Sequence, residues 1–192
     1  TSTLTPAALC NGITFHYTPT SATTGTTFAW SRAAVSGISN AAASGSNDPS
    51  ETLANTTAAP VNVTYVYTLT ANGCINVQNV VVTIKPTPLL SSELTPSAIC
   101  NNTVFYYTPT SATTGTTFAW SRSSVEGVTN SDDDGIDNPS ETLHNNVTEP
   151  VAVTYVYTLT ANGCSNTQEV VVNVNPTPVL TSTLTATPVC SS

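Results

Sequence analysis

The chain repeats itself at an interval of 90 residues. Residues 21–32 (SATTGTTFAWSR) recur unchanged at 111–122, and residues 63–74 (VTYVYTLTANGC) recur at 153–164. More than half of the aligned positions are identical, which is far above chance and makes the 90-residue repeat the unit of organisation. A chain of this kind is expected to fold as copies of one small module.

The opening segment TSTLTPAALC reappears near the end as TSTLTATPVC. Pro-Thr-Pro triplets separate the repeats, and their prolines hold such linkers extended. A lone strand would have nothing to pair with, so we interpret the chain as a section of a longer array. The expected boundaries are repeat 1 at 1–87, repeat 2 at 88–177, and the first strand of a third repeat at 178–192.

The composition favours strands over helices. Only 7% of the residues are charged, against about 25% in an average soluble domain, and Thr, Ser, Asn and Val take their places. Thr and Val branch at Cβ and suit a pleated strand. No stretch keeps the 3.6-residue period of an amphipathic helix. We therefore expect an all-β fold.

The clearest strand pattern lies at 61–70, where apolar and polar side chains alternate. Such alternation is typical of an antiparallel strand that buries one face. Asn72-Gly73 follows, and both residues tolerate the positive φ of a tight hairpin turn. The last two strands of each repeat should therefore form a hairpin.

Further strands are expected at 4–10, 13–17, 28–30, 35–38, 51–53 and 80–84. About seven short strands in 90 residues are typical of an immunoglobulin-like β-sandwich. The residues placed in its core are Trp30, Trp120, Tyr65 and Tyr155. A sugar-stacking platform is the alternative role for the two tryptophans.

The charge balance excludes some partners. The net charge is −8 and the pI is about 4.2, and the only basic side chains are Arg32, Lys85 and Arg122. Nucleic acid and anionic membranes both require clustered cations, so neither is expected as a partner. No apolar run approaches the length of a membrane span, and the first residues do not resemble a signal peptide. Any export signal or anchor is expected outside these residues.

The five cysteines follow the repeat. Cys10, Cys100 and Cys190 open repeats, while Cys74 and Cys164 follow the hairpin turn. Pairing within each repeat predicts disulfides Cys10–Cys74 and Cys100–Cys164, with the partner of Cys190 outside the chain. Each such loop would contribute about 4 kcal/mol in the chain-entropy model. A zinc cluster is disfavoured because no two cysteines are close in sequence. Stable disulfides indicate an oxidising, extracellular compartment.

No pattern predicts catalysis. The histidines, His16 and His144, occupy unrelated positions in their repeats, and no serine stands in a nucleophile-elbow motif. Glu51 and Glu141 recur after Pro-Ser, which we interpret as carboxylates of a turn or edge strand. We expect no enzymatic activity and no catalytic residue.

The acidic loop at residues 132–137 is a candidate metal site. Its carboxylates surround Gly135 in a spacing that Ca²⁺ favours. The corresponding loop of repeat 1 holds a single carboxylate, Asp48, so a solvated loop is the alternative. The candidate ligands, and the only cofactor site considered, are Asp132, Asp133, Asp134 and Asp137.

The segments TTFAWSR, NDPSETL, VTYVYTLTANGC and VVVTIKPTP resemble the PKD-like repeats of large, repetitive surface adhesins and gliding-motility proteins of Bacteroidota. The resemblance implies an immunoglobulin-like sandwich, export by a dedicated outer-membrane secretion system, and a place on the cell surface. Ser31-Arg32 and Ser121-Arg122 stand where the usual PKD pattern carries Gly-Asp-Gly, so the repeats belong to a divergent branch.

The resemblance favours a stalk or filament segment of a surface adhesin, active in attachment or gliding. Its expected partners are neighbouring repeats of the same chain and, outside it, surface glycans or a host or other substratum. One alternative is a carbohydrate-binding or accessory module of a secreted hydrolase. Another is a self-assembling fibre in which residues 181–190 complete a neighbouring chain's sandwich.

Overall fold

The computed structural model describes residues 2–182, and every regular element in this range is a strand. Repeat 1 contains β1 (Leu9–Cys10), β2 (Thr14–Phe15), β3 (Thr27–Arg32), β4 (Ala43–Ser46), β5 (Glu51–Thr52), β6 (Val61–Ala71) and β7 (Cys74–Lys85). Repeat 2 contains β8 (Ile99–Cys100), β9 (Thr103–Phe105), β10 (Thr117–Arg122), β11 (Asp133–Ile136), β12 (Glu141–Leu143), β13 (Val151–Ala161) and β14 (Cys164–Asn175). The expected all-β fold is confirmed.

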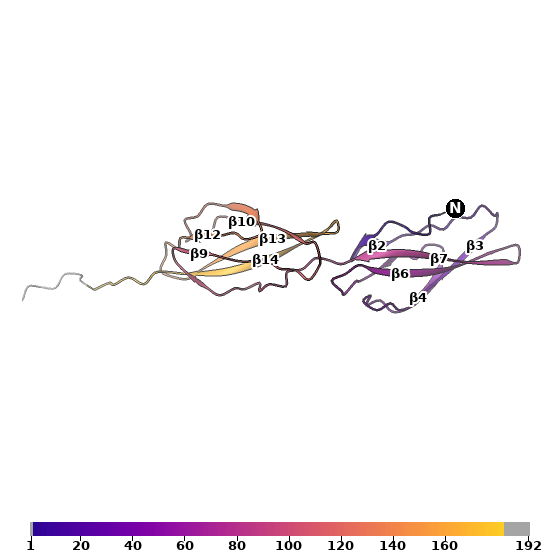
Figure 1. Ribbon diagram of the computed structural model, residues 1–192, viewed down its shortest axis with the longest axis horizontal. Helices are drawn as coiled ribbons and strands as arrows, with labels where there is room; N and C mark the ends of the chain where they lie inside the picture. The colour runs from indigo at the N-terminus through magenta and orange to yellow at the C-terminus, as the bar shows by residue number, and fades with distance from the viewer. Residues whose placement is uncertain (1, 183–192) are drawn as a thin grey trace, which may run out of the picture. The chain divides into compact units, whose positions relative to one another are not determined.

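The strands of each repeat form two sheets. In repeat 1 a five-stranded sheet has the order β1-β7-β6-β3-β4, and β2 pairs with β5 in a second sheet. Figure 1 shows β3, β6 and β7 side by side in the first repeat. Repeat 2 has the same arrangement, β11-β10-β13-β14-β8 and β12-β9. Each repeat is thus β-sandwich-like.

The β6–β7 hairpin is as the sequence predicts. The strands pair antiparallel from Val61↔Ile84 to Ala71↔Cys74. Asn72 and Gly73 form the turn with φ of 50° and 78°, a left-handed conformation that Asn and Gly adopt most readily. Alternate side chains of β6, including Val63 and Tyr65, are buried.

Four aromatic residues lie in the core as expected: Trp30, Tyr65, Trp120 and Tyr155. In each repeat the tryptophan packs edge-on against the tyrosine, with ring centroids 5.5 Å apart. The strand expected at 35–38 is wrong, because this segment forms a turn with one isolated bridge. The strand β4, which the sequence analysis missed, pairs instead with β3.

The first strand contradicts the expected disulfides. β1 runs parallel to the end of β7, with Cys10 opposite Lys85, whereas Cys74 begins β7. A strand of that length rises about 3.3 Å per residue, so about 36 Å separates its ends, and a disulfide needs Cα atoms within about 7 Å. Cys10–Cys74 pairing is therefore wrong. Cys100–Cys164 pairing is wrong for the same reason, since Cys100 lies opposite Asn175 at the end of β14.

The two compact units of the chain do not coincide with the two repeats. The first unit contains Thr1–Ser91 together with Thr110–Thr117 and Thr158–Thr167 from repeat 2. The division thus places the tip of the β13–β14 hairpin with repeat 1. The repeat boundaries at 87 and 177 stay a prediction.

Candidate functional site

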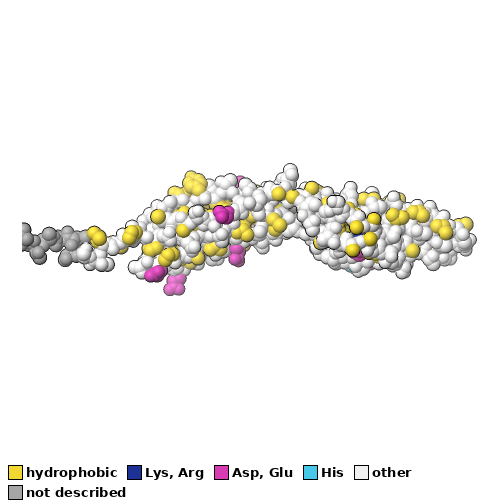
Figure 2. All heavy atoms as spheres, turned by 90° about the horizontal axis from the view of Figure 1, so that it is seen from below, with side chains coloured by type: hydrophobic (Ala, Val, Ile, Leu, Met, Phe, Trp, Pro, Cys, Tyr) yellow, Lys and Arg dark blue, Asp and Glu magenta, His cyan; other side chains and the backbone are white. Residues whose placement is uncertain are grey.

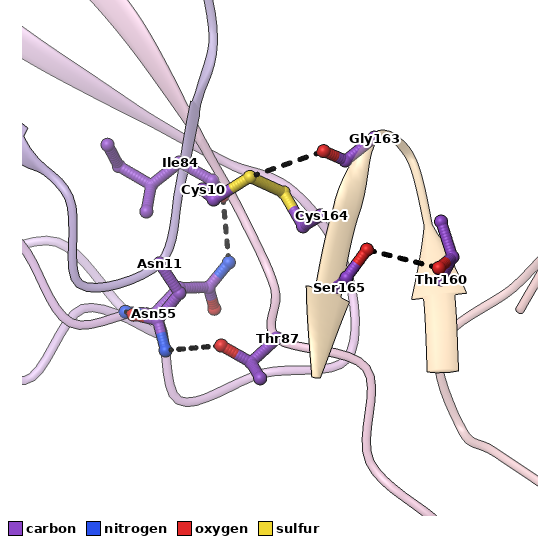
Figure 3. The surroundings of a disulfide bond; sticks show 9 residues. All are labelled: Cys10, Asn11, Asn55, Ile84, Thr87, Thr160, Gly163, Cys164 and Ser165. Carbon is purple, nitrogen blue, oxygen red and sulfur yellow. Dashed lines mark hydrogen bonds between the residues drawn. A yellow bond between two sulfur atoms is a disulfide. The ribbon is translucent and has the colours of Figure 1, made fainter. Parts of the chain in front are cut away.

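The first compact unit is closed by a disulfide between the two repeats. Cys10 is bonded to Cys164, with Cα atoms 5.7 Å apart and a sequence separation of 154 residues. Figure 3 shows the bond between the strand that carries Cys10 and the hairpin that carries Cys164. Cys164 is only 4% exposed. The disulfide thus joins the first strand of one repeat to the hairpin of the next.

The β13–β14 hairpin is held beside this strand by further contacts. The carbonyl oxygen of Gly163 lies 3.7 Å from Cys10 Sγ. Asn166 Nδ2 donates a hydrogen bond to the carbonyl oxygen of Pro88 at 3.2 Å. The segment after Pro88 also pairs with repeat 2, since the amide of Ser91 donates to the carbonyl oxygen of Thr110 at 2.8 Å. The covalent bond therefore adds to a non-covalent contact.

Two asparagines fix the position of Cys10. The amide of Asn11 donates to the carbonyl oxygen of Lys85 at 2.9 Å, and its side chain accepts from the amide of Asn55 and donates to Thr87 Oγ1. Asn55 is 6% exposed and donates to the carbonyl oxygen of Ile84 at 2.8 Å. This network, drawn in part in Figure 3, ties β1 to the end of β7. In the sequence, the only signal for this network is that both asparagines recur in repeat 2.

Two other cysteines are free in the structure. Cys74 and Cys100 are both exposed thiols, although each has the same place in its repeat as one partner of the Cys10–Cys164 bond. Cys190 lies outside the described residues.

A buried ion pair lies inside each repeat. Arg32 is 2% exposed, and its guanidinium donates two hydrogen bonds to the Glu51 carboxylate, at 2.9 and 2.8 Å. Tyr65 donates to the same carboxylate at 2.7 Å. In repeat 2 Arg122 and Glu141 form the same pair. The sequence analysis had placed the glutamates at a turn or edge strand, and β5 and β12 do begin with them, but it missed their buried partners.

The ion pair shifts the acidity of its members. The hydrogen bond from Arg32 lowers the pKa of Glu51 below its usual value, against the opposing effect of burial. Burial, together with the hydrogen bond to Glu51, raises the pKa of Tyr65 far above its usual value. The phenol is therefore neutral and the carboxylate charged at neutral pH. Because the guanidinium already occupies the carboxylate, we assign the cluster to structure.

Among the contacts that the structure describes, neither histidine belongs to a nucleophile–base pair. His16 Nδ1 lies 2.9 Å from Asp48 Oδ2 on the surface. Asp48 also accepts from the amide of Tyr17 at 2.9 Å. His144 bonds with Asn102. Each histidine thus serves a different local contact, as their unrelated positions indicated.

The predicted calcium ligands are not assembled into a site. Within residues 2–182 no group of three or more His, Cys, Asp or Glu side chains could hold a metal ion. Asp133 and Asp134 lie in β11 and pair with β10, where successive side chains point to opposite faces. Asp137 follows the strand, with φ of 55°. Asp132 and Asp133 line one hollow with Glu141, but Asp133 and Asp134 point to opposite faces of the strand. The four predicted ligands, Asp132, Asp133, Asp134 and Asp137, are therefore not gathered at one point.

The tryptophans are not exposed platforms. Trp30 and Trp120 are 7% and 5% exposed, and the backbone of Gly45 lies against the Trp30 ring. A ring covered in this way cannot stack on a sugar. The described residues contain no helix that could cross a membrane.

The first repeat matches a known family. Residues 7–88 match the PKD-like domain. PKD-like domains are typically extracellular immunoglobulin-like modules, and a disulfide is consistent with that location. The match includes every residue of the Asn11–Asn55 network. No curated protein matches the chain.

Three solved structures that resemble the chain do so only distantly. The human protocadherin-24 EC1-2 fragment is 10% identical over 92% of this chain and 95% of its own, with a TM-score of 0.41. Mouse cadherin-23 EC22-24 is 13% identical over 79% of this chain and 53% of its own, with a TM-score of 0.28. An endo-fucoidan hydrolase of glycoside hydrolase family 107 has a TM-score of 0.31 at 10% identity over 91% of this chain, which spans 28% of that enzyme. At these scores the likenesses carry no argument about function.

Proposed function

We propose that the chain is a non-catalytic structural or adhesive segment of an extracellular surface protein, in which repeats are locked together covalently to carry tension. The observation that supports this most is the Cys10–Cys164 disulfide, which spans 154 residues and two repeats. A bond of that span is not needed to close a single sandwich. Its mechanical consequence is large.

Tension applied to the chain would pass through the disulfide. Force entering before Cys10 and leaving after Cys164 crosses the bond, so the residues between these cysteines are not stretched. The β-sheets inside this loop keep their ladder hydrogen bonds at forces that would unravel an unbridged chain. The segment therefore resists extension as long as the bond is oxidised.

The surface supports a passive role. In Figure 2 the visible face is mostly white, the colour of the backbone and of uncharged polar side chains, with small scattered yellow apolar patches and few magenta carboxylates. Arg32 and Arg122, two of the three basic residues, are buried in ion pairs. A surface with so few exposed cations does not favour nucleic acid as a partner. The partners we propose are neighbouring repeats and, for an adhesive array, surface glycans or a substratum.

The finer assignment is to a bacterial cell-surface adhesin, in which such an array sets the reach of an attachment or gliding filament. The family match of residues 7–88 supports the extracellular module, and the repeat supports the array. The export route proposed with it is an outer-membrane secretion system.

Single-molecule stretching between the two ends of the chain tests this function. With the disulfide intact, we expect no extension from the residues between Cys10 and Cys164. After reduction, unfolding should release roughly 50 nm of further contour length, because an extended chain spans about 3.3–3.6 Å per residue. Full extension under oxidising conditions would refute a load-bearing role for the bond. The Cys100→Ser variant is the matched control and should behave as the parent chain.

A carbohydrate-binding module is the second candidate. A hollow of about 420 Å³ in repeat 1, with the half-buried ring of Phe28 on its wall, favours it, since ligand pockets are often lined by aromatic side chains. A glycan array probed with the chain separates the two functions. Selective binding that is lost in Phe28→Ala would support the module, and an array without signal would support the structural segment.

A further inference from the structure

The first part of β7 has one edge that no other strand covers. β7 pairs with β6 along its whole length, whereas β1 reaches it only at Ile84 and Lys85. In an antiparallel pair the backbone groups of alternate residues point away from the partner strand. On β7 these are the odd-numbered residues, because the amide of Val81 donates outward to the carbonyl oxygen of Leu4 at 2.9 Å.

Three residues present the open part of this edge: Ile75, Val77 and Asn79. Their backbone groups have no hydrogen-bond partner among the residues that the structure describes. Ile75 and Val77 are 70% and 55% exposed, and no residue from 75 to 79 is charged. An uncharged edge with unpaired backbone groups and β-branched side chains is a template for a further strand.

The equivalent edge of repeat 2 has a different composition. Ser165, Thr167 and Glu169 take the places of the three residues, and polar or charged side chains discourage strand addition at an edge. All three are exposed, although the hairpin that carries them contacts the linker between the repeats, where Asn166 donates to the carbonyl oxygen of Pro88. A neighbouring repeat thus leaves this surface in solvent. The apolar edge of repeat 1 is therefore a property of its own sequence.

The edge of repeat 1 is complementary to itself. Two copies of β7 can lie antiparallel about a two-fold axis through Val77, so that Ile75 of each copy faces Asn79 of the other. Each facing pair then exchanges two backbone hydrogen bonds. Val66 of β6 is 36% exposed on the same face as Val77 and diagonal to it, so the apolar side chains of both copies meet across the axis. Because no charge opposes another, the edge fits its own copy.

We propose that the β7 edge of repeat 1 pairs with the same edge of a second copy of this chain, which joins two five-stranded sheets into one. The contact joins like surfaces about a two-fold axis, so it closes as a dimer. It involves no cysteine and does not use the tip of the hairpin, so chains with further repeats can form it as well. This inference goes beyond the proposed function, which concerns load along one chain, by naming a partner for that chain.

Sedimentation equilibrium tests the pairing in a Cys74→Ser, Cys100→Ser and Cys190→Ser background. A short strand pair buries less than the roughly 1,200 Å² of a stable interface, so the reversible dimer should appear at submillimolar protein concentration. Val77→Lys sets two like charges opposite each other and should weaken dimerisation roughly tenfold or more. Thr167→Lys makes the same change at the equivalent residue of repeat 2 and should leave dimerisation unchanged. A monomeric parent chain, or equal weakening by both variants, would overturn the proposal.

Single cysteines in the same background test the register. Val77→Cys alone should form a disulfide-linked dimer with oxidised glutathione, because hydrogen-bonded partners have Cα atoms about 5.5 Å apart. Ile75→Cys alone should stay monomeric, since its two copies lie about 14 Å apart along the strands, whereas its mixture with Asn79→Cys should cross-link. Equal linkage of Thr167→Cys and Val77→Cys, or self-linkage of Ile75→Cys, would contradict the antiparallel pairing. Single-molecule stretching involves one chain at a time, so its outcome is independent of this edge.

Discussion

Cys10 and Cys164 are neighbours in space although they belong to different repeats and lie 154 residues apart in sequence. The relationship follows from the register of β1, which places Cys10 beside the end of β7 and away from Cys74. The first strand of repeat 1 is therefore bonded to the hairpin of repeat 2. The disulfide thus links the two repeats and does not close either one by itself.

Removing the staple should destabilise the chain. Closing a loop of this length contributes about 5 kcal/mol in the chain-entropy model, so Cys10→Ser should lower the free energy of unfolding by an amount of this order. Urea unfolding followed by tyrosine and tryptophan fluorescence measures it. Cys100→Ser, which removes a free exposed thiol, should leave the midpoint unchanged; equal midpoints for the two variants would contradict the account.

The buried ion pair should be sensitive to loss of one charge. In Glu51→Gln the Arg32 guanidinium stays buried without its counter-charge, which costs about 3–5 kcal/mol for such a pair. The expected result is a lower thermal midpoint for the first repeat. Glu126→Gln, at an exposed carboxylate, is the control and should have little effect. A similar midpoint for both variants would show that the pair is not structural.

The same pair predicts a pH dependence. The Arg32 hydrogen bond lowers the folded-state pKa of Glu51 below its usual value of 4.5, so the unfolded chain binds the proton more readily. The stabilisation is present above pH 4.5 and is lost as the pH falls through the folded-state pKa. Unfolding measured across this range should show a shallower loss of stability in Glu51→Gln than in the parent chain. Parallel curves would contradict the prediction.

The glycine under the core tryptophan should not accept a larger residue. A Cβ atom on Gly45 would lie 2.9 Å from Trp30 Cζ2, and such overpacking typically costs about 1–3 kcal/mol. Gly45→Ala should therefore lower stability and alter tryptophan fluorescence. Ser44→Ala, on the exposed neighbouring residue, serves as the comparison, and an equal effect of both changes would argue against close packing of the ring.

The features that the sequence predicted are those set by local pattern. The 90-residue repeat, the alternation that buries Val63 and Tyr65, and the Asn72-Gly73 turn all depend on neighbouring residues. The core position of Trp30 follows from a tryptophan in the third strand of a sandwich. The strand β4 has no such pattern, since Gly45 is there to accommodate a ring from β3 and not to fill a hydrophobic face.

The features that were missed depend on long-range register. The pairing of Arg32 with Glu51 requires knowing that β3 and β5 bring both side chains under the same tyrosine. The disulfide partner of Cys10 requires knowing that β1 is parallel to the end of β7. Even spacing of cysteines is equally compatible with pairing within a repeat and between repeats, so the sequence pattern could not distinguish them.

Peptide mapping of the oxidised chain tests the central claim most directly. Trypsin cleaves after Arg32 and Arg122 and not before Pro86, so the denatured, thiol-blocked chain yields peptides 1–32, 33–122 and 123–192. In a Cys190→Ser background the Cys10–Cys164 bond gives a linked mass that no pairing with Cys74 or Cys100 gives. The account predicts that peptide 1–32 is joined to 123–192 through Cys10 and Cys164. Joining of 1–32 to 33–122 would contradict it.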